Sequence, residues 1–213
     1  MCGRFTLHTP IHELVERFGP LDFESSYTPS YNIAPTQSVL TIIPGEKNPR
    51  AFPMRWGLVP PWQGQRGGKP LINARLETLS EKPTFRRLVN TKRCLILADG
   101  FFEWKKEGAT KHPVYITLNQ GEPFAFAGLW DNGEVPACTI VTQAASPNLK
   151  PVHDRMPVIL TPESEALWLS QTPFSALQDQ LPDKDSLPLS FYKVNTYVNS
   201  PNNNDATCIV PMG

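Results

Sequence analysis

The stretch RCLILADGFFEW, residues 93–104, decides the expected fold of this chain. Its apolar run at residues 94–98 stops at Asp99-Gly100, and a second apolar run begins at once. Short apolar runs bounded by turn residues are typical of buried strands. Other segments of this kind follow one another without alternating helices: SVLTII (38–43), AFPMRWGLV (51–59), HPVYITL (112–118), PFAFAGLW (123–130), ACTIVT (137–142), MPVIL (156–160) and FYKVNTYV (191–198). This order predicts an α+β domain of mostly antiparallel sheet with helices packed outside it.

A few short helices are expected around this sheet. The clearest covers TPIHELVERFG, residues 9–19, where Thr9 can cap the first turn and Gly19 can end the helix. TPESEALWL, residues 161–169, also begins with Thr-Pro, and Thr161 is its expected cap. Two more helices are expected around PTFRRLV (83–89) and FSALQDQL (174–181). Because no domain boundary is visible, we expect a single domain over residues 1–213.

Composition argues against several classes of protein. No apolar run approaches the 18 residues of a membrane span, and the N-terminus lacks the basic and apolar regions of a secretory signal. We therefore expect a cytoplasmic protein with no membrane contact. The four cysteines form no C-x-x-C pair, so we expect no metal site and no other cofactor. An even count could form two disulfides, but a long intracellular chain favours reduced thiols. Cys94 and Cys138 lie in apolar strands and are expected in the core.

Charge is unevenly distributed, although the formal net charge is zero. Residues 1–150 carry 17 Lys and Arg against 13 Asp and Glu, whereas residues 151–213 carry 3 against 7. A basic surface on the first part would suit a polyanionic partner. An ordinary mixed surface explains the same counts equally well.

Polar residues interrupt two apolar segments and are candidates for chemistry. In LINARLET, residues 71–78, the side chains of Asn73, Arg75 and Glu77 alternate, so a strand would place all three on one face. In ADGFFEW, residues 98–104, Glu103 lies between aromatic residues, where burial raises the pKa of a carboxyl group toward that of a useful general acid. Taken singly, each group is better explained as a solvated position.

Histidine, arginine and tryptophan residues extend this set. In PVHDRMPVIL, residues 151–160, His153 can carry protons near neutral pH and Arg155 can bind a phosphate, although a lone His-Asp pair is more often not catalytic. Trp56 is expected in the core. Trp62 begins the Gly-rich loop WQGQRGGKP, residues 62–70, where it could stack on a base; a plain surface loop is the alternative.

The N-terminal stretch MCGRF, residues 1–5, places a cysteine directly after the first methionine. Removal of Met1 would give Cys2 a 1,2-aminothiol, which no internal cysteine offers. An α-amine with a pKa of about 7.7–8.0 can attack an aldehyde, and the thiol can then close a thiazolidine on the imine carbon. A ring-opened abasic site in DNA is such an aldehyde. Arg4, Arg75 and Arg155 would then bind the flanking phosphates.

Eight motifs occur in order along the chain: MCGRF (1–5), YNIAPTQ (31–37), WGLVPPW (56–62), INARLET (72–78), RRLVNTKRCLILADGFFEW (86–104), AFAGLW (125–130), TIVTQAA (139–145) and HDRMPVIL (153–160). Together they resemble the SRAP family, the SOS-response-associated peptidase domain proteins that shield abasic sites in single-stranded DNA. The resemblance covers residues 1 to about 199. It implies a single α+β domain with a strongly twisted, barrel-like sheet and a few peripheral helices.

The resemblance also implies roles for individual residues. Cys2 would be the nucleophile, and Asn73 would hold its amine and the lesion. Glu103 would promote opening of the sugar ring, and His153 would move protons during the Schiff-base steps. The implied DNA contacts are Arg4, Asn32, Pro35, Trp62, Arg75, Trp104 and Arg155. The chain departs from some bacterial members at Gln63, where they carry a second aromatic residue.

The resemblance implies an enzyme that cross-links itself to abasic sites, and two other functions stay open. One is a thiol peptidase or autopeptidase that uses Cys2, with strand cleavage through the Schiff base as an added activity. The other is non-covalent binding of single-stranded DNA. The expected partners are DNA with abasic sites and the replication machinery, with association to the nucleoid in a bacterium. No heptad pattern is present, so a monomer is expected.

Overall fold

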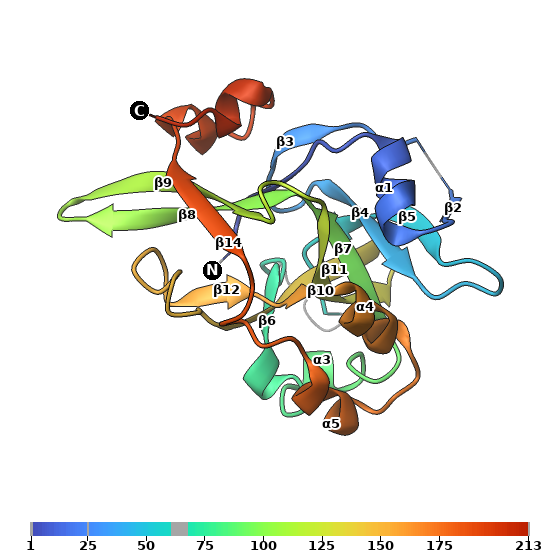
Figure 1. Cartoon of the computed structure of the whole chain (residues 1–213). Coiled ribbons are helices and arrows are strands. Elements are labelled where there is room, and N and C mark those ends of the chain that lie inside the picture. The colour runs from blue at the N-terminus through green and yellow to red at the C-terminus, as the bar shows by residue number, and fades with distance from the viewer. Residues whose placement is uncertain (1, 25, 61–67, 213) are drawn as a thin grey trace.

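The computed structural model describes residues 2–24, 26–60 and 68–212, and two sheets organise it (Figure 1). We call them the small and the large sheet. The small sheet has the order β14 (Leu189–Lys193), β9 (Thr110–Leu118), β8 (Gly100–Glu107), β1 (Phe5–Leu7) and β3 (Ser30–Ile33). The large sheet has the order β12 (Arg155–Pro157), β11 (Pro136–Ala144), β10 (Phe124–Asn132), β7 (Arg93–Ala98), β4 (Ser38–Ile43), β5 (Arg50–Trp56) and β2 (Asp22–Phe23).

Two short strands and one extra pairing complete the large sheet. β13 (Ile159–Leu160) pairs with β10, and β6 (Asn73–Arg75) pairs with β11. β5 also pairs with β11, so strands β11, β10, β7, β4 and β5 form a closed ring. The pairs of β11 with β5 and β6, and of β2 with β5, are parallel, while the other pairs among the described strands are antiparallel. The predicted α+β class with a mostly antiparallel, barrel-like sheet is therefore confirmed.

The stretch RCLILADGFFEW forms the junction between the two sheets. β7 belongs to the large sheet and β8 to the small sheet, with Asp99 between them. A side chain at Gly100 would collide with the ring of Tyr115, so glycine is required where the chain crosses. The sequence correctly predicts both strands.

The helices lie close to the predicted segments: α1 (Ile11–Phe18), α3 (Pro83–Arg86), α4 (Pro162–Leu169) and α5 (Phe174–Leu177). Thr161 caps α4, and its backbone N–H donates to Ser164 Oγ at 2.8 Å. The prediction that Thr9 caps α1 is wrong. Pro10 is the N-cap residue, and the hydroxyl of Thr9 instead donates to Asp99 at 2.9 Å.

Short 3₁₀ helices account for several turns: Leu76–Thr78, Gln178–Gln180, Thr196–Asn199 and Ala206–Ile209. The strand predicted through LINARLET is shorter than expected. β6 ends at Arg75, and Glu77 lies on the 3₁₀ turn that follows it. Glu77 therefore does not continue the alternation of Asn73 and Arg75.

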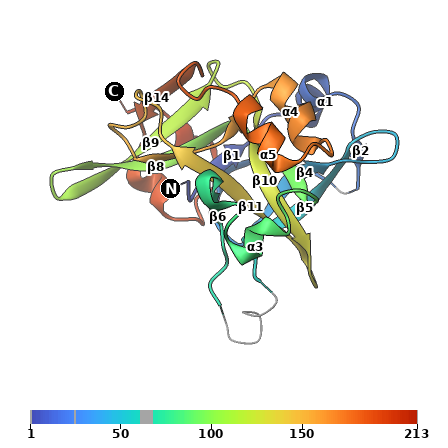
Figure 2. The ribbon, with the colours of Figure 1, turned by 90° about the horizontal axis from the view of Figure 1, so that it is seen from below.

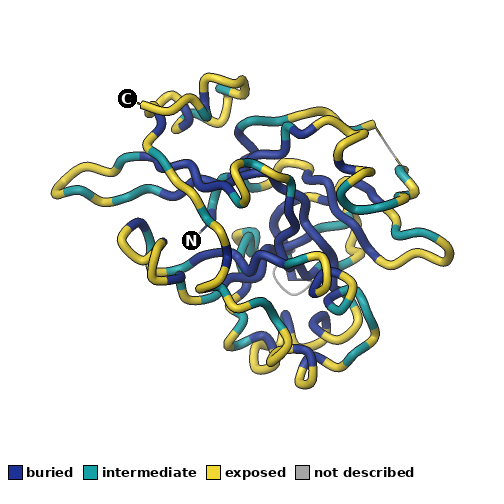
Figure 3. The backbone as a smooth tube through the Cα atoms, in the orientation of Figure 1, coloured by how far each residue is buried: buried dark blue, intermediate teal, exposed yellow. Residues whose placement is uncertain are grey.

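The core lies between the two sheets and is drawn dark blue in Figure 3. Phe5 and Phe101 of the small sheet pack edge-on against Phe126 of the large sheet, with ring centroids 5.6 and 5.9 Å apart. Trp56 is buried as predicted. Cys94 and Cys138 are also in the core, and all four cysteines, each in a described range, are free thiols.

A second cluster lies on the other face of the small sheet. Phe102 and Tyr115 pack there against Val198 and Cys208, under the C-terminal segment of residues 194–212. We call this segment the C-terminal cover. Figure 2 shows the molecule from below, with the β8–β9 hairpin projecting beyond the body.

Candidate active site

Cys2 lies at the start of the segment that becomes β1, and it is fully buried. The amide Nδ2 of Asn73, on β6, donates to the carbonyl oxygen of Cys2 at 2.9 Å. Burial raises the pKa of the Cys2 thiol far above its usual range, and the charge of Glu103 acts in the same direction. The thiol is therefore overwhelmingly protonated at neutral pH.

Asn73 has a second polar atom in this site. Among the described residues, its Oδ1 is buried without a hydrogen-bond partner. A buried amide oxygen with no partner costs free energy, which an incoming donor would recover. Asn73 thus holds the backbone of Cys2 with one atom and offers an acceptor with the other.

Glu103 comes from β8, whose inner face also carries Phe101 into the core. Only 4% of Glu103 is exposed, and this burial raises the pKa of its carboxyl group to about 7. Near neutral pH the group is divided between acid and carboxylate, so it can both donate and accept a proton.

His153 approaches Glu103 from the turn before β12. Its Nε2 lies 3.9 Å from Glu103 Oε2, and its Nδ1 accepts the backbone N–H of Arg155 at 3.0 Å. Nε2 is the ring nitrogen that faces Glu103. Asp154 Oδ1 lies 2.8 Å from Nδ1 and is poised to pair with the imidazolium form. Burial lowers the pKa of His153, which favours the neutral ring.

The three predicted phosphate-binding arginines have different surroundings. Arg75 is exposed, and no ion pair of its side chain occurs within the described ranges. Arg155 forms a two-pronged ion pair with Glu77, at 2.6 and 2.9 Å. Arg4 donates to Asn32 Oδ1 at 2.7 Å and to the carbonyl of Val198 at 2.9 Å. Of the three, Arg75 is the most available to a ligand.

Two of the remaining predicted DNA contacts, Asn32 and Trp104, bond to the C-terminal cover. Asn32 is buried, and its Nδ2 donates to three carbonyls of the cover, those of Val198, Ser200 and Asn203, at 2.6–3.2 Å. Trp104 Nε1 donates to Asn199 Oδ1 at 2.8 Å. Pro35 lies half-buried in the turn after β3. Trp62 and most of residues 62–70 lie outside the described residues, so those expectations stay untested.

Sequence reasoning did not foresee two parts of this site. Glu77 was noted, but its pairing with Arg155 was not, because the two residues are 78 positions apart. The contribution of the C-terminal cover was also missed. Its one local signal is the enrichment in asparagine at residues 199–204, since asparagine commonly caps turns and bonds backbone groups.

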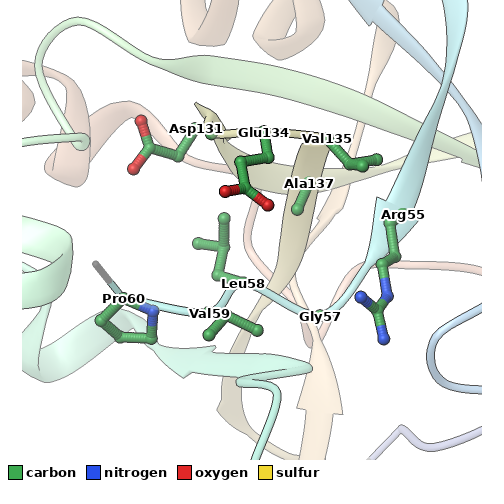
Figure 4. A pocket seen from close by; sticks show the side chains of 10 residues that line it. Arg55, Gly57, Leu58, Val59, Pro60, Asp131, Glu134, Val135 and Ala137 are labelled. Atoms are coloured by element: carbon green, nitrogen blue, oxygen red, sulfur yellow. The ribbon is translucent and has the colours of Figure 1, made fainter. Parts of the chain in front are cut away.

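A cavity lies apart from this cluster. It has a volume of about 600 Å³ and is formed by the end of β5, residues 57–60 and the β10–β11 hairpin (Figure 4). Arg55, Asp131 and Glu134 lie among its lining residues. Neither Cys2 nor its neighbours Asn73, Glu103 and His153 line it, so this cavity is separate from the site around Cys2.

The described residues contain no group of three or more His, Cys, Asp or Glu side chains arranged to hold a metal ion. They also contain no helix long and apolar enough to cross a membrane.

Comparison with known proteins gives the family. The model of the family described as SOS response associated peptidase (SRAP) matches residues 1–201. Abasic site processing protein YoqW of Bacillus subtilis is 45% identical, over 98% of this chain and 99% of its own. Abasic site processing protein YedK of Escherichia coli is 33% identical over the full length of both. A solved protein of Bacteroides thetaiotaomicron, 26% identical, superimposes with a TM-score of 0.85 over 99% of this chain and 100% of its own. The chain belongs to the SRAP family.

Proposed function

We propose that this member of the SRAP family processes abasic sites in single-stranded DNA and bonds to them covalently through Cys2. The names of its relatives support abasic-site processing. The observation that supports the covalent step is that four residues lie together. Asn73 hydrogen-bonds the backbone of Cys2, and Glu103 lies beside His153. The charge of Glu103 also acts on the Cys2 thiol and raises its pKa.

The first step would open the sugar ring of the lesion. With its pKa raised to about 7, Glu103 still holds a proton at neutral pH in a large fraction of molecules. It would give this proton to the ring oxygen as the bond between that oxygen and C1′ breaks. The C1′ hydroxyl loses its own proton, so the step is an isomerisation that leaves an aldehyde at C1′.

The second step would join the amine to the aldehyde. Removal of Met1 frees the α-amine of Cys2, and Asn73 Oδ1 would accept one of its N–H groups while the lone pair attacks C1′. The resulting carbinolamine loses its hydroxyl as water after protonation by the Glu103 and His153 pair. The product is an imine between Cys2 and C1′.

The third step would close the ring. The thiol sulfur of Cys2 adds to C1′, and its proton passes to the imine nitrogen through Glu103 or His153. The overall reaction releases one water and involves no oxidation. A thiol with a raised pKa suits this order, in which the amine reacts first. It suits a thiol peptidase less well, because a peptidase needs the thiolate from the start.

The test is a denaturing gel with protein whose loss of Met1 has been confirmed by mass. The protein is mixed with a single strand carrying one abasic site, and with an intact strand of the same sequence. We expect a heat-stable shifted band with the abasic strand alone. Cys2→Ala and Cys2→Ser keep the α-amine but lose the thiol, so each should lose the heat-stable band and leave only an adduct that needs borohydride to survive.

Cys138→Ala is the matched control, because it removes a different buried thiol from β11. This variant should keep the band. If the processed protein gives no band with the abasic strand, covalent capture is wrong, and peptidase activity or non-covalent binding becomes the better account.

A further inference from the structure

Two short strands on opposite edges of β11 set the spacing between Asn73 and His153 (Figure 1). At Thr142 of β11, β6 pairs through Arg75 and β12 pairs through Pro157, so the two strands flank β11. Asn73 is the first residue of β6, and His153 lies two residues before β12 begins. Each flanking strand has only three residues. The spacing of the two side chains therefore depends on what ties β6 and β12 together across β11.

The ion pair of Glu77 and Arg155 is such a tie. Glu77 lies on the 3₁₀ turn after β6, and Arg155 is the first residue of β12. The guanidinium donates to both carboxylate oxygens of Glu77, at 2.6 and 2.9 Å, and to the backbone carbonyl of Thr142 at 2.7 Å. A two-pronged pair of this kind has a fixed geometry because the guanidinium is planar. One side chain thus bonds the turn after β6 and the middle strand at once.

Arg155 is also connected to the ring of His153. Its backbone N–H donates to His153 Nδ1 at 3.0 Å, so a displacement of Arg155 would move the ring. The other ring nitrogen, Nε2, lies 3.9 Å from Glu103 on β8. The fixed position of Arg155 therefore keeps the histidine ring facing the buried acid of the small sheet.

The surroundings of the pair suit a role in positioning. The Arg155 side chain is 16% exposed, and both of its terminal nitrogens already bond within the protein. The hydrogen bonds from Arg155 lower the pKa of Glu77, so this carboxylate is charged at neutral pH. The Glu77 side chain is 49% exposed, and a pair that is open to water adds little to overall stability. Removal of Glu77 should therefore leave the fold intact and loosen only the tie.

We propose that Glu77 is a positioning residue for His153. Its carboxylate holds the guanidinium of Arg155, and the backbone of Arg155 holds the histidine ring toward Glu103. The use of His153 as a proton carrier rests on the function proposed above, whereas the coupling of Glu77 to the position of the ring does not.

The first experiment follows the titration of the His153 ring by NMR in the full chain. Burial lowers the pKa of this ring, and the charged groups around it are Glu103 from β8, Lys111 from β9 and the neighbouring Asp154. Glu77→Ala should raise the pKa toward about 6.5, because a ring that is no longer held turns into solvent. Loss of a nearby negative charge would by itself lower the pKa of a histidine. A lowered or unchanged pKa would therefore overturn the proposal.

The second experiment asks whether Glu77 acts through His153 in the reaction. Adduct formation is measured in a single turnover with saturating abasic strand for Glu77→Ala, His153→Ala and the double variant. Glu77→Ala should slow the reaction by about 10- to 100-fold, because a small displacement of a reacting group costs this much. In the double variant it should add little, since the ring is already absent. Effects of the two substitutions that simply multiply would overturn the proposal.

Glu81→Ala is the matched control. Glu81 is exposed, lies four residues after Glu77 and takes part in no ion pair within the described ranges. The control removes the same charge and should keep the wild-type titration and rate, so an equal effect in it would contradict the proposal. If the wild type forms no adduct, the proposed function fails, and the NMR titration still decides the role of Glu77.

Discussion

Two buried carboxylates lie four residues apart, on either side of the crossing between the sheets. Asp99 and Glu103 are 1% and 4% exposed. Asp99 accepts hydrogen bonds of 2.5–2.9 Å from the Thr6 hydroxyl, from the backbone N–H groups of His8 and Thr9, and from the Thr9 hydroxyl. Glu103 instead faces His153 and the Cys2 thiol, which themselves gain and lose protons.

The difference teaches that burial does not by itself make an acid reactive. Asp99 is surrounded by fixed hydrogen-bond donors and anchors the segment after β1. The pKa of Glu103, raised to about 7 by burial, leaves its proton available for transfer. We therefore expect the two acids to be separable by experiment, one in reaction rate and the other in stability.

The largest effect is expected from Glu103→Gln in the reaction. The amide keeps the shape of the side chain but cannot transfer a proton, so the rate of adduct formation should fall by about 10²–10⁴-fold. The rate is measured in a single turnover with saturating abasic strand, beside the affinity for an intact strand. Equal rates in variant and wild type would remove the distinction between the two acids.

Asp99→Asn should act on stability instead. The amide loses the charge and one acceptor, and the donors around it lose their partner, so the free energy of unfolding should fall by about 3 kcal/mol. Urea unfolding measures this loss, and the adduct rate is measured at a temperature where the variant stays folded. A large drop in rate with unchanged stability would reverse the assignment.

The pH dependence of stability should reveal the raised pKa of Glu103 and so distinguish it from Asp99. Its folded pKa is above the unfolded value of 4.5, so the folded state holds this proton more tightly. Raising the pH from about 4.5 to above 7 should therefore lower the stability, by about 2–3 kcal/mol from this group. Glu103→Gln should remove that loss and be more stable than wild type at pH 8. Parallel pH profiles for the two proteins would contradict the raised pKa.

The smallest effect is expected from Thr6→Val. It removes one hydroxyl, which donates to Asp99 Oδ1 at 2.5 Å and lies 2.8 Å from the Tyr115 hydroxyl. We expect a loss of about 1–2 kcal/mol in the free energy of unfolding and an unchanged adduct rate. A slowed reaction at full stability would mean that the Asp99 network also tunes the chemistry.

Local patterns in the sequence predicted the elements well. The strands on both sides of Asp99-Gly100 and the cap at Thr161 follow from apolar runs and turn residues that are neighbours in the chain. The wrong cap at Thr9 has a different cause, since the hydroxyl is taken by Asp99, 90 residues away. A contact at that distance leaves no trace in a local pattern.

In the candidate site, too, local patterns predicted the residue types but not the long-range contacts. Its residue types could be selected from the sequence, because Glu103 lies among aromatics and His153 beside an acid. The closeness of Asn73 and His153 could not be predicted from local patterns, since it depends on β6 and β12 both pairing with β11. Glu103 comes to them from β8 of the other sheet. The pairing of Glu77 with Arg155 likewise required the turn after β6.

The hydrogen bonds of Arg4 and Asn32 to the C-terminal cover can form only after the cover has been synthesised. Arg4 meets the carbonyl of Val198, 194 positions later, and Asn32 meets that of Asn203, 171 positions later. Synthesis runs from the amino end toward the carboxyl end, so Arg4 and Asn32 leave the ribosome long before the carbonyls that they bind. The segment that carries Cys2 is thus made well before the cover can fix it, and it stays open to a processing aminopeptidase during that interval.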